Sequence, residues 1–211
     1  MLGTAAFLIA CGTKAQREMA LPPEPTSTLS VPEAITTDKA NFERNLLEAP
    51  DLDMCFEFPV CGAISSYFSV EHPLGIDIDT YNNPNPQVKA ASSGKVIFSG
   101  GDACCSYGLH VVLEHEQEAF TLYAHMSTLG VMEGDKVTTG QAIGVVGNTG
   151  YSTSEHLHFE IMKAKDGQLE EARRILVQTP NAENEIVTSP LYYYNPLVYL
   201  RNGGNEICSL Q

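Results

Sequence analysis

The residues best suited to chemistry in this sequence are two histidines separated by one position, His156 and His158. In a β-strand both side chains would point to the same face, because side chains alternate across a pleated backbone. The neighbouring residues favour a strand, since Leu157, Phe159 and Ile161 alternate with polar positions. Two imidazoles held side by side fit a zinc site with one metal-binding histidine and one catalytic partner.

A second alternating run ends at His125 and predicts a polar face that carries Thr121, Tyr123 and His125. Further upstream, His72 and Asp77 add an imidazole and a carboxylate close together in the sequence. Each of these residues alone is more often a half-buried polar side chain than a ligand. Their convergence in one region predicts a metal site, because zinc binds both imidazole nitrogen and carboxylate oxygen. We assign no function to the strand histidines His110 and His115.

Several ordered motifs together resemble the lysostaphin-type (LytM-like) zinc endopeptidases of peptidoglycan. They lie at residues 72–79, 123–126, 134–141 and 147–160, within a resemblance that covers 67–162 and resumes at 195–200. The resemblance implies one zinc ion, with His72, Asp77 and His158 as metal ligands. It also implies that His125 and His156 form a catalytic pair, in an enzyme that hydrolyses peptide bonds of peptidoglycan cross-links.

The first motif departs from the family pattern His-x-Gly-x-Asp. Pro73 stands where the family has its histidine, and His72 comes one residue earlier. Two interpretations stay open: a local bulge carries the extra residue and re-aims His72 toward the metal, or the first ligand is lost.

The implied ligand set suits hydrolysis. Three protein ligands leave a fourth position on zinc for water or a substrate oxygen, and zinc lowers the pKa of bound water. A nearby histidine can accept the proton of the water, and another can hydrogen-bond the developing oxyanion. The sequence has no His-Glu-x-x-His motif, so it does not belong to the helix-based metalloproteases.

Two other functions compete with this enzyme. The Gly-Asp-Lys-Val run at 134–137 also resembles a turn of lipoyl- and biotinyl-carrier domains, but no exposed lysine tip for modification accompanies it. The stronger rival is a non-catalytic relative that binds the cell wall or activates a separate amidase. Retention of Asp77, His125, His156 and His158 favours the enzyme, and metal analysis would separate the two.

Composition fits one domain with an N-terminal extension. The 211 residues carry a net charge of −14, from 26 acidic and 12 basic residues, which argues against nucleic acid as a partner. The hydrophobic content of 43% supports a core, and no apolar run is long enough for a spanning helix. The six cysteines fit an exported protein. Cys55 and Cys61 could pair across a short loop, Cys104 and Cys105 are adjacent, and the connectivity stays open.

Four segments are predicted along the chain. Residues 1–11 resemble a lipoprotein signal, with lipid attached to Cys11, although an ordinary secretory peptide is an alternative. Residues 12–50 are predicted to be a flexible tether because 21–28 is rich in proline, and 203–211 a C-terminal tail. The zinc endopeptidase domain is predicted at 51–202. These predictions place the protein in the cell envelope, exported and anchored to the membrane by lipid.

Short strands separated by glycine-containing turns predict an all-β fold, with antiparallel sheets forming a barrel-sandwich with an open cleft. We expect strands at 88–91, 95–99, 109–115, 119–125, 136–137, 142–146 and 157–162. Residues 163–190 could form one or two amphipathic helical turns, and a solvated loop is the favoured interpretation.

Overall fold

Antiparallel strands dominate the computed structural model, which describes residues 33–83, 86–178 and 189–201. The strands are β1 (Phe56–Glu57), β2 (Ala63–Ser66), β3 (Ile76–Asp79), β4 (Gln87–Lys89), β5 (Gly94–Gly100), β6 (Leu109–Glu114), β7 (Ala119–Leu129), β8 (Lys136–Val137), β9 (Ala142–Val146), β10 (His156–Ala164), β11 (Leu191–Tyr194) and β12 (Leu200–Arg201). The helices are α2 (Glu33–Glu48), the 3-10 turn η1 (Glu116–Glu118), α3 (Leu169–Leu176) and α4 (Pro196–Tyr199). The predicted all-β class is confirmed.

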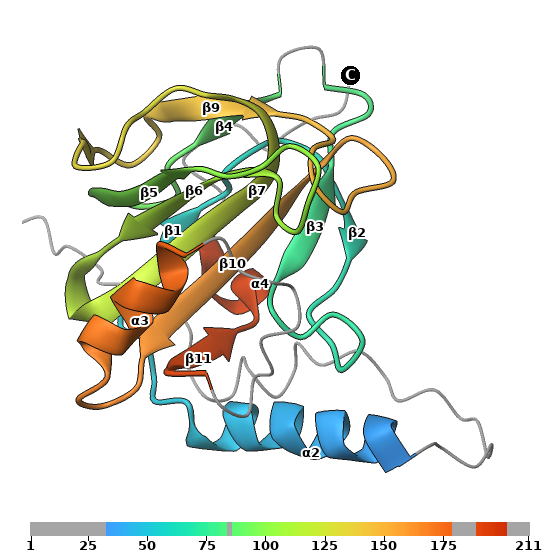
Figure 1. Cartoon of the computed structure of the whole chain (residues 1–211), viewed down its shortest axis with the longest axis vertical. Helices are drawn as coiled ribbons and strands as arrows, with labels where there is room; N and C mark the ends of the chain where they lie inside the picture. Colours follow the sequence, from blue (N-terminus) through green and yellow to red (C-terminus); the bar gives the residue numbers. More distant parts are fainter. Residues whose placement is uncertain (1–32, 84–85, 179–188, 202–211) are drawn as a thin grey trace, which may run out of the picture.

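One large sheet contains most of these strands, in the order β2-β3-β10-β7-β6-β5-β8. In addition, β11 pairs with β10, and β9 pairs with both β7 and β4. The long strands β7 and β10 cross the centre of the molecule (Figure 1). The predicted antiparallel arrangement is confirmed, whereas the predicted barrel does not close among the described strands, because β2 and β8 remain at the two ends of the sheet.

The core forms where the apolar faces of β3, β7 and β10 meet. Leu157, Phe159 and Ile161 of β10 are fully buried, as are Ile76 and Ile78 of β3. These side chains alternate with polar ones along each strand, so the opposite face is left for the polar residues. Burial of one face fixes the register of both strands, because a slip by one residue would expose the whole apolar set.

Helix α2 occupies part of the segment predicted to be a tether, and it packs along the lower end of the sheet (Figure 1). The Asn45 side chain donates to the Tyr193 carbonyl at 2.7 Å and accepts the Tyr193 N–H at 3.0 Å, while Phe42 packs on Phe68 with ring centroids 5.0 Å apart. The structure therefore differs from the prediction at 33–48. The proline cluster that suggested a tether lies upstream, and α2 contains neither proline nor glycine. Residues 12–32 lie outside the described residues.

Helix α3 corrects the prediction of a loop after residue 163. Its Ala172 and Leu176 are buried, and Arg173 binds the Glu114 carboxylate of β6 with Nη2 to Oε1 at 2.5 Å. Apolar residues at 169, 172 and 176 recur at helical spacing and give the helix a face for the sheet. Among the described residues, no helix is both long and apolar enough to span a membrane.

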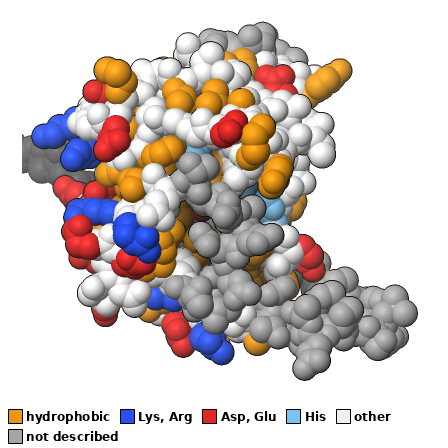
Figure 2. Space-filling view, in the orientation of Figure 1, with side chains coloured by type: hydrophobic (Ala, Val, Ile, Leu, Met, Phe, Trp, Pro, Cys, Tyr) orange, Lys and Arg blue, Asp and Glu red, His pale blue; other side chains and the backbone are white. Residues whose placement is uncertain are grey.

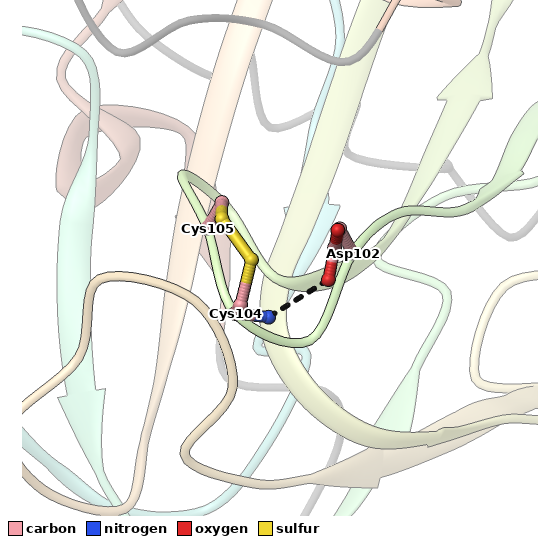
Figure 3. The surroundings of a disulfide bond; sticks show 3 residues. All are labelled: Asp102, Cys104 and Cys105. Atoms are coloured by element: carbon pink, nitrogen blue, oxygen red, sulfur yellow. Dashed lines mark hydrogen bonds between the residues drawn. A yellow bond between two sulfur atoms is a disulfide. The ribbon is translucent and has the colours of Figure 1, made fainter.

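The loop between β5 and β6 contains a disulfide between the adjacent residues Cys104 and Cys105 (Figure 3). The Asp102 carboxylate accepts the Cys104 N–H at 3.0 Å and tightens the turn. Cys55 and Cys61 are disulfide-bonded as well, but within the described residues no disulfide joins them to each other, contrary to the pairing that their spacing allowed.

Candidate metal centre

Three residues predicted as ligands lie together on the polar face of the sheet. Potential ligand atoms of His72, Asp77 and His158 all lie within 4.8 Å of one another. The Nδ1 atom of His158 is 2.7 Å from Asp77 Oδ1, and the Nε2 atom of His72 is 3.3 Å from the same oxygen. Two imidazoles and one carboxylate at this spacing form a donor set that suits zinc.

The pairing of β3 with β10 creates this contact. Asp77 and His158 are directly opposite in the antiparallel register, so their side chains share a face. Gly75 permits the close approach of the chain before β3, because a Cβ atom there would lie 2.2 Å from the Phe159 carbonyl oxygen. A side chain at position 75 would therefore push the two strands apart.

His72 reaches the site from a turn that precedes β3. The His72 N–H donates to the Ser69 carbonyl at 3.2 Å, and the Ser69 N–H donates to the His72 carbonyl at 3.1 Å. His72, Pro73 and Leu74 all precede Ile76, the first residue of the β3–β10 ladder. The His72 ring faces Asp77 and His158, with its Nε2 atom 3.3 Å from Asp77 Oδ1 and the His72 and His158 ring centroids 5.0 Å apart.

The His72 ring also shows that the site fits a metal. Its Nε2 atom is buried and makes no hydrogen bond, because the 3.3 Å approach to Asp77 lacks hydrogen-bond geometry. A buried polar atom without a partner is costly, and a metal ion would satisfy it. The role of His72 as a ligand stays a prediction.

His125 enters the site through an irregular backbone and not through strand alternation. Its φ is +60°, in the left-handed region that residues other than glycine seldom adopt. At this point β7 changes partners, since it pairs with β10 up to Ala124 and with β9 from Met126. The turned backbone brings the His125 ring to 4.8 Å from the His156 ring and 6.0 Å from the His158 ring.

The prediction that Thr121, Tyr123 and His125 share one polar face is therefore wrong. Tyr123 and Thr121 are fully buried on the core side, where the Tyr123 ring packs on Phe159 at 5.3 Å. The Tyr123 hydroxyl accepts the Ala91 N–H at 2.9 Å. His125 lies on the other side of the sheet, because the left-handed residue interrupts the alternation.

Both members of the predicted catalytic pair donate a hydrogen bond to a carbonyl of the loop between β9 and β10. His125 Nδ1 lies 2.7 Å from the Thr149 carbonyl oxygen, and His156 Nδ1 lies 2.9 Å from the Ser154 carbonyl oxygen. Carbonyl oxygen only accepts, so each Nδ1 carries hydrogen and each neutral ring keeps its lone pair on Nε2. The His156 Nε2 atom is 3.8 Å from Asp77 Oδ1, which places it beside the proposed ligands.

Burial and neighbouring charges separate the pKa values of the site residues. Burial, with smaller contributions from His158 and His156, lowers the pKa of His125 to about 4, so this ring is neutral at pH 7. Burial raises the pKa of Asp77, but the adjacent imidazoles of His158 and His72 outweigh this effect and hold that pKa well below its usual range. In the metal-free protein, burial lowers the pKa of His158, while Asp77 and Glu160 raise it to about 9.

Two residues that contact His158, Tyr107 and Glu160, are not predicted from the sequence. The Glu160 carboxylate accepts hydrogen bonds from His158 Nε2 at 3.0 Å and from the Tyr107 hydroxyl at 2.5 Å. Glu160 is only 1% exposed. The signal that could have found it is the strand period, because Glu160 follows His156 and His158 on the same face of β10.

The histidines face an open cleft of about 330 Å³. Its walls come from the turn before β3, the loop before β6 and the loop before β10. Histidine side chains come to the surface on the face shown in Figure 2. The cleft gives a substrate access to the polar face of the sheet.

Comparison with known proteins identifies related sequences. Residues 71–170 match the model of the family described as Peptidase family M23. Lysostaphin from Staphylococcus simulans is 38% identical over 97 residues, which are 43% of this chain and 20% of lysostaphin. The murein hydrolase activator NlpD from Salmonella dublin is 29% identical over 136 residues, which are 64% of this chain and 35% of NlpD.

Among solved structures, the SpoIIQ–SpoIIIAH pore-forming complex contains a chain with a TM-score of 0.51 and 24% sequence identity. The alignment covers 72% of this chain and 94% of that chain, and it shows a shared fold.

Proposed function

We propose that this chain is a zinc-dependent metalloendopeptidase that hydrolyses peptide bonds in peptidoglycan cross-links, because residues 71–170 match the model of peptidase family M23. One observation carries the proposal: three metal-binding side chains converge within 4.8 Å, and two further histidine rings lie beside them. Lysostaphin supports the assignment as a relative, although the match covers 20% of its length.

His72, Asp77 and His158 would hold the zinc ion, and the buried Nε2 atom of His72 supports this assignment. When bound, zinc would lower the pKa of a water molecule and polarise the carbonyl of the scissile peptide. His125 would accept a proton at Nε2, because its Nδ1–H is donated to Thr149 and its low pKa keeps the ring neutral. His156 would bind the developing oxyanion from Nε2 when that nitrogen carries a proton.

The alternative function is that of a non-catalytic protein that binds the wall or activates a separate hydrolase. NlpD supports this alternative, because it is named a murein hydrolase activator and is similar over 64% of this chain. The presence of both predicted catalytic histidines beside the ligand set favours the enzyme, since an activator needs neither ring for proton transfer.

We also propose that the protein acts in the cell envelope, where peptidoglycan lies, and that lipid on Cys11 anchors it to the membrane. The resemblance of residues 8–11 to the end of a lipoprotein signal supports the anchor. Cys11 itself lies outside the described residues.

The proposed function is tested with the purified full chain. We expect about one zinc ion per chain by elemental analysis and release of new peptide termini from purified peptidoglycan, identified by mass spectrometry. An activator would release nothing alone but would stimulate an added amidase. A zinc-loaded chain that leaves the wall intact and stimulates an amidase would overturn the enzyme in favour of the activator.

A further inference from the structure

We propose that Glu160 is a positioning residue of the metal centre, which holds His158 in the tautomer that presents Nδ1 to the metal. The Tyr107 hydroxyl in turn holds the Glu160 carboxylate in place. This inference rests on the proposed zinc site and adds the residues that orient one of its ligands.

Hydrogen-bond chemistry defines the tautomer. A carboxylate accepts only, so the contact of 3.0 Å between His158 Nε2 and Glu160 Oε1 places a proton on Nε2. The contact between Nδ1 and the Asp77 carboxylate likewise places a proton on Nδ1 in the metal-free protein. Metal binding would displace that proton while Glu160 keeps the one on Nε2, so the neutral ring would then have its lone pair on Nδ1. That atom is the one 2.7 Å from Asp77 Oδ1, on the side where the other potential ligand atoms gather. If the proton moved to Nδ1, the ring would lose its ability to bind the metal from that side.

The carboxylate itself is held from two sides. Glu160 is 1% exposed, and a buried carboxylate requires hydrogen-bond partners. Tyr107 supplies one of them, with its hydroxyl 2.5 Å from Glu160 Oε1. The Tyr107 ring also stacks on the His158 ring, with centroids 5.7 Å apart and an interplanar angle of 27°. The ring of His158 is therefore fixed by a contact at its edge and a contact on its face.

The position of Glu160 in the sheet makes this arrangement rigid. It lies two residues after His158 in β10, which is paired with β7 on one edge and with β3 and β11 on the other. The carboxylate and the imidazole thus share a face of a strand whose backbone is hydrogen-bonded on both sides. Tyr107 also links Glu160 and His158 to His125, because the Tyr107 carbonyl accepts the His125 N–H at 2.9 Å.

A carboxylate behind a metal-binding histidine also strengthens the ligand. It raises the basicity of the imidazole and fixes the orientation of the ring, and loss of such a partner reduces metal affinity by about 10- to 100-fold. With Asp77 and Glu160 on either side, His158 lies between two carboxylates, whose two negative charges would balance the charge of one zinc ion.

The test compares zinc affinity, by competition with a chelator, in the wild type, Glu160→Ala, Glu160→Gln and Tyr107→Phe. We expect Glu160→Ala to weaken zinc binding by about 10- to 100-fold. Glu160→Gln keeps an oxygen that accepts the Nε2–H, so it should restore most of the affinity. Tyr107→Phe should cause a smaller loss than Glu160→Ala, because the carboxylate remains. As a matched control, Glu114→Ala removes a carboxylate that binds Arg173, and it should lower thermal stability without changing zinc affinity.

A second measurement reads the tautomer directly. In zinc-loaded protein with 15N-labelled histidine, the wild type should show a protected Nε2–H signal for His158, and Glu160→Ala should lose that protection. A wild type that binds no zinc would refute the proposed function itself. A wild type that binds zinc, with folded Glu160→Ala binding it equally well, would overturn only the role of Glu160. If Glu160→Ala does not fold, Glu160→Leu takes its place, because leucine fills the space without an acceptor oxygen. Unchanged zinc affinity and Nε2–H protection in that variant would overturn the role of Glu160.

Discussion

The left-handed backbone at His125 predicts an unusual order of stability for two substitutions. At most strand positions glycine is less stable than alanine by about 0.5–1 kcal/mol, because glycine loses more conformational freedom on folding. At φ = +60° an alanine Cβ atom approaches the carbonyl oxygen, which costs about 1–2 kcal/mol and is absent in glycine. The two effects oppose each other, and the midpoints of the two ranges differ by about 0.75 kcal/mol in favour of His125→Gly over His125→Ala.

Calorimetric unfolding of the two variants measures this difference. We expect the Tm of His125→Gly to exceed that of His125→Ala by about 1–4 °C for a domain of this size. Both scans use metal-free protein, because bound zinc would itself shift the Tm. The control is Ala124→Gly, one residue earlier on regular strand, which should lower stability by about 1–2 kcal/mol through lost burial and added chain freedom. Equal or greater stability of His125→Ala would refute the left-handed assignment.

Five further outcomes are expected. Asp77→Ala and His158→Ala should each lose bound zinc in elemental analysis, whereas the control His110→Ala, at a buried histidine outside the proposed ligand set, should retain it. His156→Ala should keep zinc but lower the rate of peptidoglycan hydrolysis by about 10²–10⁴-fold, and loss of metal in this variant would instead make His156 a ligand. In the metal-free protein, burial lowers the pKa of His158, but Asp77 and Glu160 raise it to about 9. Zinc must therefore displace a proton from His158, and chelator competition should show a zinc affinity that increases as the pH rises toward 9. For the same reason, the stability that this proton gives the metal-free protein is present below about pH 6.5 and is lost as the pH rises through 9, and a chemical unfolding series across that range would reveal the loss. Cys11→Ser should release the protein from the detergent phase, and an unlipidated wild type in the aqueous phase would refute the anchor.

The sequence predicts the part of the site that regular strands create. Alternation along β10 places His156 and His158 on one face, and pairing with β3 brings Asp77 opposite His158. These contacts follow from a period of two residues and from burial of the apolar face, both of which are visible in the sequence.

The residues predicted less well depend on features without a sequence period. The turn of the backbone at His125 reverses the face expected for that run, and neither a glycine nor a proline marks it. The contact of Tyr107 with Glu160 joins residues 53 positions apart through a loop, so strand patterns cannot reveal it. Helix α2 was not predicted, because the proline-rich segment before it suggested a flexible tether for the whole region.

Metal binding and proton transfer, the two proposed roles of the site, depend on parts of the chain that should unfold separately. His158 and Asp77 lie on strands paired inside the main sheet, and such amides exchange with solvent only when much of the domain opens. The carbonyls that orient His125 and His156 belong to the loop between β9 and β10, at Thr149 and Ser154. This loop can open locally at a lower free energy. On warming, hydrolysis should therefore fail before zinc is released, and cooling should restore it without added metal.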